Sequence, residues 1–124
     1  MGIGGSAELK TTMSDRRQVP RYIAEFHAQA SQPPGAPPQS VTLVNLSMSG
    51  CSLEGAASLI AGQYCEIAFE QEGRQFRAEA TVTWKSSQGE VGLKFLYASP
   101  TDLELLRKTC ATLRLQPLAH REDQ

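Results

Sequence analysis

The sequence contains few of the residues that build catalytic or metal centres. Its 124 residues include only two histidines, His27 and His120, and three widely spaced cysteines, so no side chains have the spacing of a zinc site. No glycine-rich loop leads from an expected strand into an expected helix, which excludes a P-loop and a dinucleotide fingerprint. No nucleophile is paired with a base at the spacing of a catalytic triad. We therefore expect neither an enzyme, nor a metal site, nor a bound cofactor.

The chain also lacks a strong charge of either sign and a long apolar run. Twelve basic and thirteen acidic residues give a formal net charge of −1, whereas a general nucleic-acid binder is usually strongly basic. No row of aromatic residues on one sheet offers stacking for single-stranded nucleic acid. The longest apolar runs are too short to cross a bilayer. We expect no binding to nucleic acid and no insertion into a membrane, and any anion site must be local.

The cysteines indicate a reduced environment. Cys51, Cys65 and Cys110 each lie in an apolar pattern, as small core residues do, and an odd, dispersed set does not form a disulfide framework. With no apolar leader, a cytoplasmic location is the simplest interpretation.

Residues 15–115 are expected to form one domain, preceded by a flexible arm over residues 1–14. Alternating polar and apolar residues predict antiparallel strands, and the clearest case has Phe76, Ala78, Ala80, Val82 and Trp84 on one face. In the last strand Val91, Leu93, Phe95 and Tyr97 should share a face in the same way. The expected strands are near residues 22–29, 41–46, 51–54, 65–70, 76–84 and 91–97.

A change of period after the last strand predicts a helix near residues 100–115. Ser99 and Asp102 form an N-terminal capping signature with Pro100 at the first helical position. The apolar residues at helical spacing are Leu103, Leu106, Cys110 and Leu113. Residues 116–124 are expected to be a flexible tail. Six short strands followed by one amphipathic helix predict an all-β fold with an appended helix, a small six-stranded antiparallel barrel at about residues 22–98.

Three arginines cluster in the segment DRRQVPRY. Arg17 and Arg21 are four residues apart, Arg16 is adjacent, and Pro20 prevents a regular helix through them. A guanidinium can donate two parallel hydrogen bonds to a phosphate or to the O6/N7 edge of guanine. Most such pairs in proteins are simply solvated surface residues, and this interpretation stays open for the segment taken alone.

A second polar segment, NLSMSG, lies between two expected strands. Asn45 and Ser47 are two residues apart at a strand end, so their side chains should point the same way. Both can hydrogen-bond to a base edge or a ribose, and Gly50 permits a positive φ or a close approach of the backbone to a ligand. The alternative is a plain turn that caps itself with side-chain hydrogen bonds.

The order RxxxR, one strand, then [DN]xSxxG in a six-stranded chain that ends in a helix resembles the PilZ domain. The aromatic residue of VTW, the following turn and the strand VGLKF also look like the end of that family. The resemblance covers roughly residues 15–115. Asn45 replaces the commoner aspartate within the family's pattern and removes one negative charge.

This resemblance implies a receptor for the bacterial second messenger cyclic di-GMP. In that case Arg17 and Arg21 clamp the ligand, Asn45 and Ser47 read a guanine, and Gly50 is the permissive backbone position. The arm before the first strand folds over the nucleotide and signals to a downstream protein, which the sequence does not identify.

Two further residues have roles that the resemblance only suggests. Arg16 directly precedes the motif, which in the family goes with a stacked pair of ligands, so we expect two nucleotides per domain. Trp84 either plugs the end of the barrel or forms a wall of the ligand pocket. The alternative function is an adaptor barrel that binds a protein partner without nucleotide.

Overall fold

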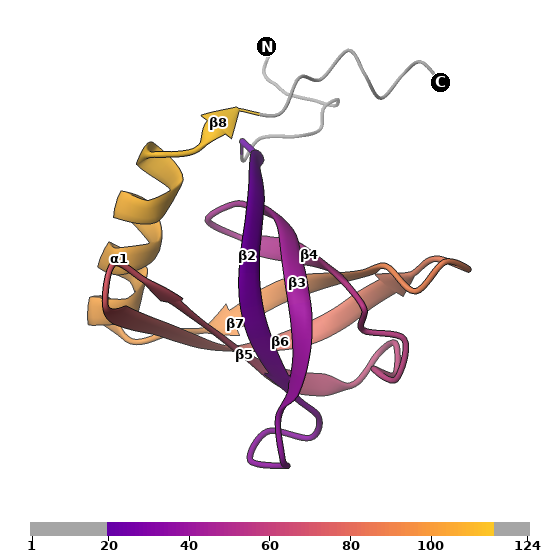
Figure 1. The fold of residues 1–124 in the computed structure, drawn as a ribbon. Coiled ribbons are helices and arrows are strands. Elements are labelled where there is room, and N and C mark those ends of the chain that lie inside the picture. The colour runs from indigo at the N-terminus through magenta and orange to yellow at the C-terminus, as the bar shows by residue number, and fades with distance from the viewer. Residues whose placement is uncertain (1–19, 116–124) are drawn as a thin grey trace, which may run out of the picture.

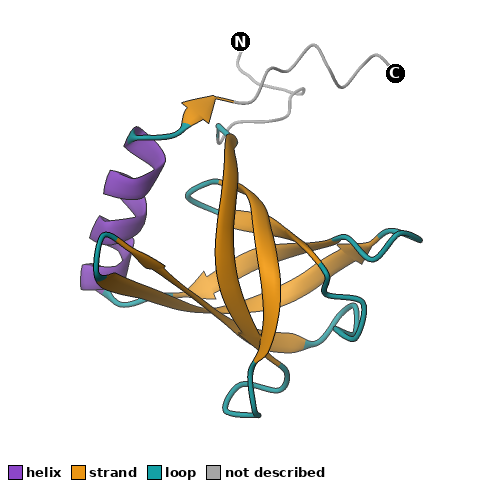
Figure 2. Ribbon diagram, in the orientation of Figure 1, coloured by secondary structure: helices purple, strands orange, loops and turns teal. Residues whose placement is uncertain are grey.

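A computed structural model of the chain describes residues 20–115, and these residues form a closed barrel with one helix beside it (Figures 1 and 2). Six antiparallel strands follow the hydrogen-bonded order β3-β4-β7-β6-β5-β2, and the pairing of β2 with β3 closes the ring. The predicted six-stranded barrel with a C-terminal helix is confirmed. The strands are β2 (Tyr22–Ser31), β3 (Gln39–Leu46), β4 (Gly50–Glu54), β5 (Tyr64–Gln71), β6 (Arg74–Lys85) and β7 (Val91–Tyr97).

The helix α1 (Pro100–Ala111) is shorter than expected, and a seventh strand follows it. The Ser99 hydroxyl accepts a hydrogen bond from the backbone N–H of Asp102 at 3.0 Å, as the capping signature predicts. Instead of continuing to about residue 115, the chain leaves the helix and forms β8 (Arg114–Leu115). β8 pairs with the first residues of β2. Only this non-local partner could decide between helix and strand for so short a segment.

The face that α1 buries agrees with the expected one at Leu106 and Cys110 and differs from it at Leu103 and Leu105. Leu105, Leu106 and Cys110 are buried against the barrel, while Leu103 is 42% exposed. Leu103 lies in the first turn of the helix, which begins beside the end of β7 (Figure 1). The helix is therefore rotated relative to the stripe that spacing alone suggested, because its contact with the barrel, and not its own periodicity, decides which leucines are covered.

Two β-bulges overturn the simple alternation that the sequence suggested. In the β6–β7 ladder Val82 pairs with Leu93 but Trp84 pairs with Gly92, so Thr83 is an extra residue and Trp84 changes face. Trp84 is 40% exposed and does not share the buried face of Val82. A second bulge in the same ladder leaves Tyr97 outside the barrel and 64% exposed.

The three cysteines are free and buried, as their apolar surroundings indicated. Within residues 20–115 no helix is both long and apolar enough to cross a membrane. The inner face of the barrel is filled by aliphatic side chains and by a series of neighbouring phenyl rings. Phe26 stacks on Phe69 and Phe69 on Phe76, while the ring of Phe95 is tilted relative to that of Phe76. This packed interior leaves the outer surface of the strands for binding.

Candidate ligand-binding site

The two sequence motifs meet at one end of the β2–β3 ladder. Tyr22, the first residue of β2, pairs with Leu46, the last residue of β3. Arg21 directly precedes Tyr22 and Ser47 directly follows Leu46, so both residues leave the ladder at the same end. Arg21 is exposed. Arg16 and Arg17, the other predicted arginines, lie outside the described residues.

The Ser47 hydroxyl organises the turn between β3 and β4. Its Oγ accepts hydrogen bonds from the backbone N–H groups of Ser49 and Gly50, both at 3.1 Å. The backbone N–H of Ser47 also donates to the carbonyl oxygen of Gly50 at 2.8 Å. Ser47 is 6% exposed. In this structure the serine therefore caps its own turn, which is the structural alternative to ligand binding, and a contact with a base stays a prediction.

Gly50 is a glycine because of a neighbouring strand. A Cβ built on Gly50 lies only 2.0 Å from the carbonyl oxygen of Leu93 on β7, and the other close atoms are also β7 backbone. Gly50 is not among the residues with positive φ. The sequence suggested a close approach to a ligand, whereas the close approach in this structure is to β7, and it brings the Ser47–Gly50 turn tightly against that strand.

Strand register places Asn45 and Trp84 in one row on the outer surface of the barrel. Asn45 pairs with Ser52 on β4, Ser52 with Gly92 on β7, and Gly92 with Trp84 on β6. The neighbours of these residues point inward: Leu46 pairs with Cys51 and Cys51 with Leu93, and all three are buried. At about 4.8 Å between strands, Asn45 and Gly92 are about 10 Å apart.

The indole of Trp84 lies flat against the row. A Cβ on Gly92 would be 2.1 Å from Nε1 and 2.3 Å from Cε2 of that ring, so the ring occupies the space that any other residue at position 92 would fill. Trp84 therefore does not plug the barrel end. It forms a partly exposed aromatic surface over Gly92 on the outside of β7.

Together these residues form a surface with the chemistry of a purine-nucleotide site. An aromatic ring can stack on a base, the amide of Asn45 can pair with a base edge, and the Arg21 guanidinium can bind a phosphate or a guanine. Ser52 and Gly92 were not singled out from the sequence. Only the register of three strand pairs identifies them, although the G in VGLKF was visible as a residue without a side chain.

Comparison with known families identifies the fold. The family model described as PilZ domain matches residues 15–111. The chain belongs to the PilZ domain family. No curated protein matches the sequence.

Solved PilZ structures share the fold at low sequence identity. The PilZ domain with c-di-GMP of YcgR from Escherichia coli has a TM-score of 0.64 at 19% identity, over 80% of this chain and 92% of that one. The Bacillus subtilis inhibitor of motility MotI/DgrA also has a TM-score of 0.64, at 20% identity over 79% of this chain, but this chain spans only 51% of its length. The PilZ domain of CeSA from a cellulose-synthesizing bacterium has a TM-score of 0.59 at 14% identity, covering 74% of this chain and 95% of that one.

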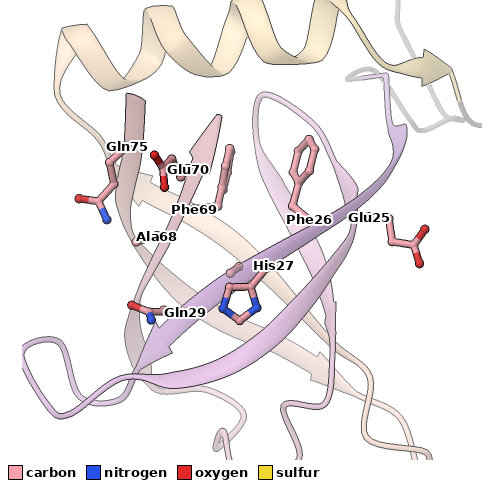
Figure 3. A pocket seen from close by; sticks show the side chains of 9 residues that line it. Glu25, Phe26, His27, Gln29, Ala68, Phe69, Glu70 and Gln75 are labelled. Atoms are coloured by element: carbon pink, nitrogen blue, oxygen red, sulfur yellow. The ribbon is translucent and has the colours of Figure 1, made fainter. Parts of the chain in front are cut away.

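A pocket of about 460 Å³ lies elsewhere on the PilZ barrel, where β2 separates from β5 (Figure 3). Phe26 and Phe69 point toward α1 and Glu25 points away from them (Figure 3). No residue of the two motifs lines this pocket. Its carboxylates, Glu25 and Glu70, would repel an anionic ligand, so we do not assign the nucleotide to it.

Within the described residues there is no group of three or more histidine, cysteine, aspartate or glutamate side chains that could hold a metal ion.

Proposed function

We propose that this chain is a cyclic di-GMP receptor, and that the ligand lies on the outer surface of the barrel over the row from Asn45 to Trp84. The observation that carries the proposal is the strand register, which brings Arg21 and the Ser47–Gly50 turn to one ladder end beside that row. The cyclic di-GMP-bound PilZ domain of YcgR, which has the same fold, supports the choice of ligand.

In this proposal each motif residue has one task. Arg17 and Arg21 clamp phosphates and guanine edges, and Asn45 pairs with a guanine. Ser47 and Gly50 act mainly through the turn, since the serine hydroxyl and the glycine Cα are already committed to contacts within the barrel. The indole of Trp84 stacks on a guanine, because it is flat, partly exposed and on the same outer row.

Two further parts of the proposal concern the number of ligands and the signal to a downstream protein. Arg16 supports a second, stacked nucleotide, so we expect two ligands per domain. Closure of the N-terminal arm over the ligand creates a new surface for a downstream protein. No catalytic step is included, because the output of such a receptor is a change of shape and contact.

The test is calorimetric titration of the purified chain with cyclic di-GMP at near-physiological salt, with GTP as the control ligand. Saturable binding of cyclic di-GMP alone is expected, and Arg21→Ala should weaken it by at least about a hundredfold, because a charge-assisted bidentate contact is lost. Arg74→Ala, an exposed arginine at the start of β6 and away from the motifs, is the matched control and should bind normally. Equal binding by Arg21→Ala and wild type would show that the clamp is wrong.

Trp84 gives a second, independent readout because it is the only tryptophan of the chain. Ligand stacking on the indole should change its fluorescence in proportion to the heat measured. Full binding by calorimetry with unchanged fluorescence would remove Trp84 from the site while the receptor function stands. Arg16→Ala should reduce the stoichiometry from two ligands to one, and an unchanged ratio would remove the pair.

Complete absence of binding, with no shift of the melting temperature at high ligand concentration, would favour the second candidate. That candidate is an adaptor barrel that binds a protein partner without nucleotide. The exposed aromatic and aliphatic side chains at the end of β7, Leu96 and Tyr97, would suit such a contact.

A further inference from the structure

Lys94 lies on the outer surface of the barrel, beside the Ser47–Gly50 turn and one outward position along β7 from Gly92. On β7 it pairs with Gly50 of β4 on one side and with Thr81 of β6 on the other. Its neighbour Leu93 is buried and Lys94 is exposed, so the lysine side chain points outward. Gly50 is the last residue of the NxSxxG motif, and Lys94 is therefore the cross-strand neighbour of that turn.

Lys94 is also next to the tryptophan surface. Gly92, two residues earlier on the same strand, shares the outer face with Lys94, and successive outward residues of a strand are about 7 Å apart. The indole of Trp84 lies over Gly92. The lysine thus stands between the Ser47–Gly50 turn and the indole, within reach of a molecule that contacts both.

Several other cations of the described region are already engaged. Arg77 forms an ion pair with Glu66, Arg107 forms one with Glu104, and the ammonium group of Lys85 donates to the carbonyl oxygen of Ala57. Within residues 20–115, no carboxylate forms an ion pair with Lys94. Its ammonium group is a compact, strongly hydrated charge with three donors, which suits a phosphate oxygen.

We propose that Lys94 is a further ligand-contacting residue, and that its ammonium group binds a phosphate of the nucleotide held over the Asn45–Trp84 row. This inference rests on the proposed receptor function and extends it by one residue that lies in neither sequence motif. With guanines placed at Asn45 and on the indole, the phosphates that join them lie over Ser52 and Gly92, and Lys94 is the next outward residue of β7 after Gly92.

The test compares Lys94→Ala, Lys94→Glu and Lys94→Arg with the wild-type chain by cyclic di-GMP titration, at about 50 mM and about 500 mM salt. Lys94→Ala should bind about five- to tenfold more weakly at the lower salt, in keeping with the loss of one exposed charge-assisted contact. Lys94→Glu should bind still more weakly, and Lys94→Arg should stay within about threefold of wild type because the charge and the donors remain. The differences should shrink at the higher salt.

Lys108→Glu is the matched control, because Lys108 is an exposed lysine in the last turn of α1 and the change alters the net charge equally. Equal weakening by Lys108→Glu and Lys94→Glu would show a general charge effect and overturn the contact. Normal binding by Lys94→Glu, in a chain whose Arg21→Ala variant fails to bind, would overturn the role of Lys94 and leave the receptor function intact. Absence of binding by wild type would overturn both. Unchanged melting temperatures of the ligand-free variants would show that a loss of affinity does not arise from unfolding.

Discussion

Replacement of Gly50 by alanine is expected to destabilise the barrel strongly, although the residue lies at a strand end. The new Cβ would be 2.0 Å from the carbonyl oxygen of Leu93, and Cβ atoms do not approach other atoms closer than 3.0 Å. The difference of 1.0 Å must be met by moving β4 away from β7, because the obstructing atom is backbone and cannot rotate aside.

This movement affects the whole short ladder between β4 and β7. Gly50 is the first of only four paired positions in that ladder, and the neighbouring Ser49 carbonyl oxygen accepts a hydrogen bond from the backbone N–H of Phe95 at 2.8 Å. Overpacking of this kind costs about 1–3 kcal/mol, and a rigid obstacle places the cost near the upper end. For a domain of this size, about 3 kcal/mol lowers the melting temperature by roughly 12 °C.

The assay is urea and thermal unfolding of the ligand-free chain, with Gly55→Ala as the matched control. Gly55 has a φ of +75°, and a Cβ at this position would meet nothing within 4 Å. Its replacement therefore tests backbone strain without a collision and should cost about 1 kcal/mol. A Gly50→Ala variant that is no less stable than Gly55→Ala would refute the reasoning. It would show that this glycine serves the ligand and not the packing of β4 on β7.

Two further predictions concern the turn and the buried thiols. Ser47→Ala should lower the free energy of unfolding by about 1–2 kcal/mol even without ligand, because two backbone N–H groups lose their acceptor. Ser47→Thr keeps the hydroxyl and should restore most of this free energy. An unchanged urea midpoint for the alanine variant would contradict the role of Ser47 in the turn. Burial raises the pKa of Cys65 and of Cys110 from the ordinary 9.0 to about 11 and raises that of Cys51 as well. The folded chain therefore keeps thiol protons that the unfolded chain loses, so the contribution of the thiols to stability is fully present below about pH 9 and is lost as the pH rises toward 11. Urea midpoints measured between pH 9 and pH 11 record this loss of stability. Cys65→Ala should make the loss smaller. A midpoint that stays constant up to pH 11 would contradict the role of the buried thiols.

The elements of the fold were predictable because their signals are local. Alternation identified the six strands, and the Ser99 and Asp102 pattern located the start of α1. Spacing alone left Arg21, Asn45 and Ser47 open to other interpretations, and the resemblance of the combined motifs to the PilZ domain selected them. The family match over residues 15–111 confirms the resemblance that those motifs carried.

The errors arose where a non-local partner overrides a local pattern. Thr83 is an extra residue only in relation to β7, so no period in the sequence could reveal that Trp84 faces outward. Arg114 and Leu115 continue a helical pattern, yet they pair with β2. Leu103 was expected to be buried and is exposed because the barrel contacts a different side of α1.

The sequence by itself determined the six barrel strands and the start of the helix, because a period of two or of 3.6 residues is a property of the chain's own backbone geometry. Only the tertiary structure decided which residues share the candidate site. Asn45, Gly92, Lys94 and Trp84 lie on three different strands, and their neighbourhood depends on register, bulges and closure of the barrel. These are set by packing between segments far apart in the chain, where a shift of one residue moves every side chain to the opposite face.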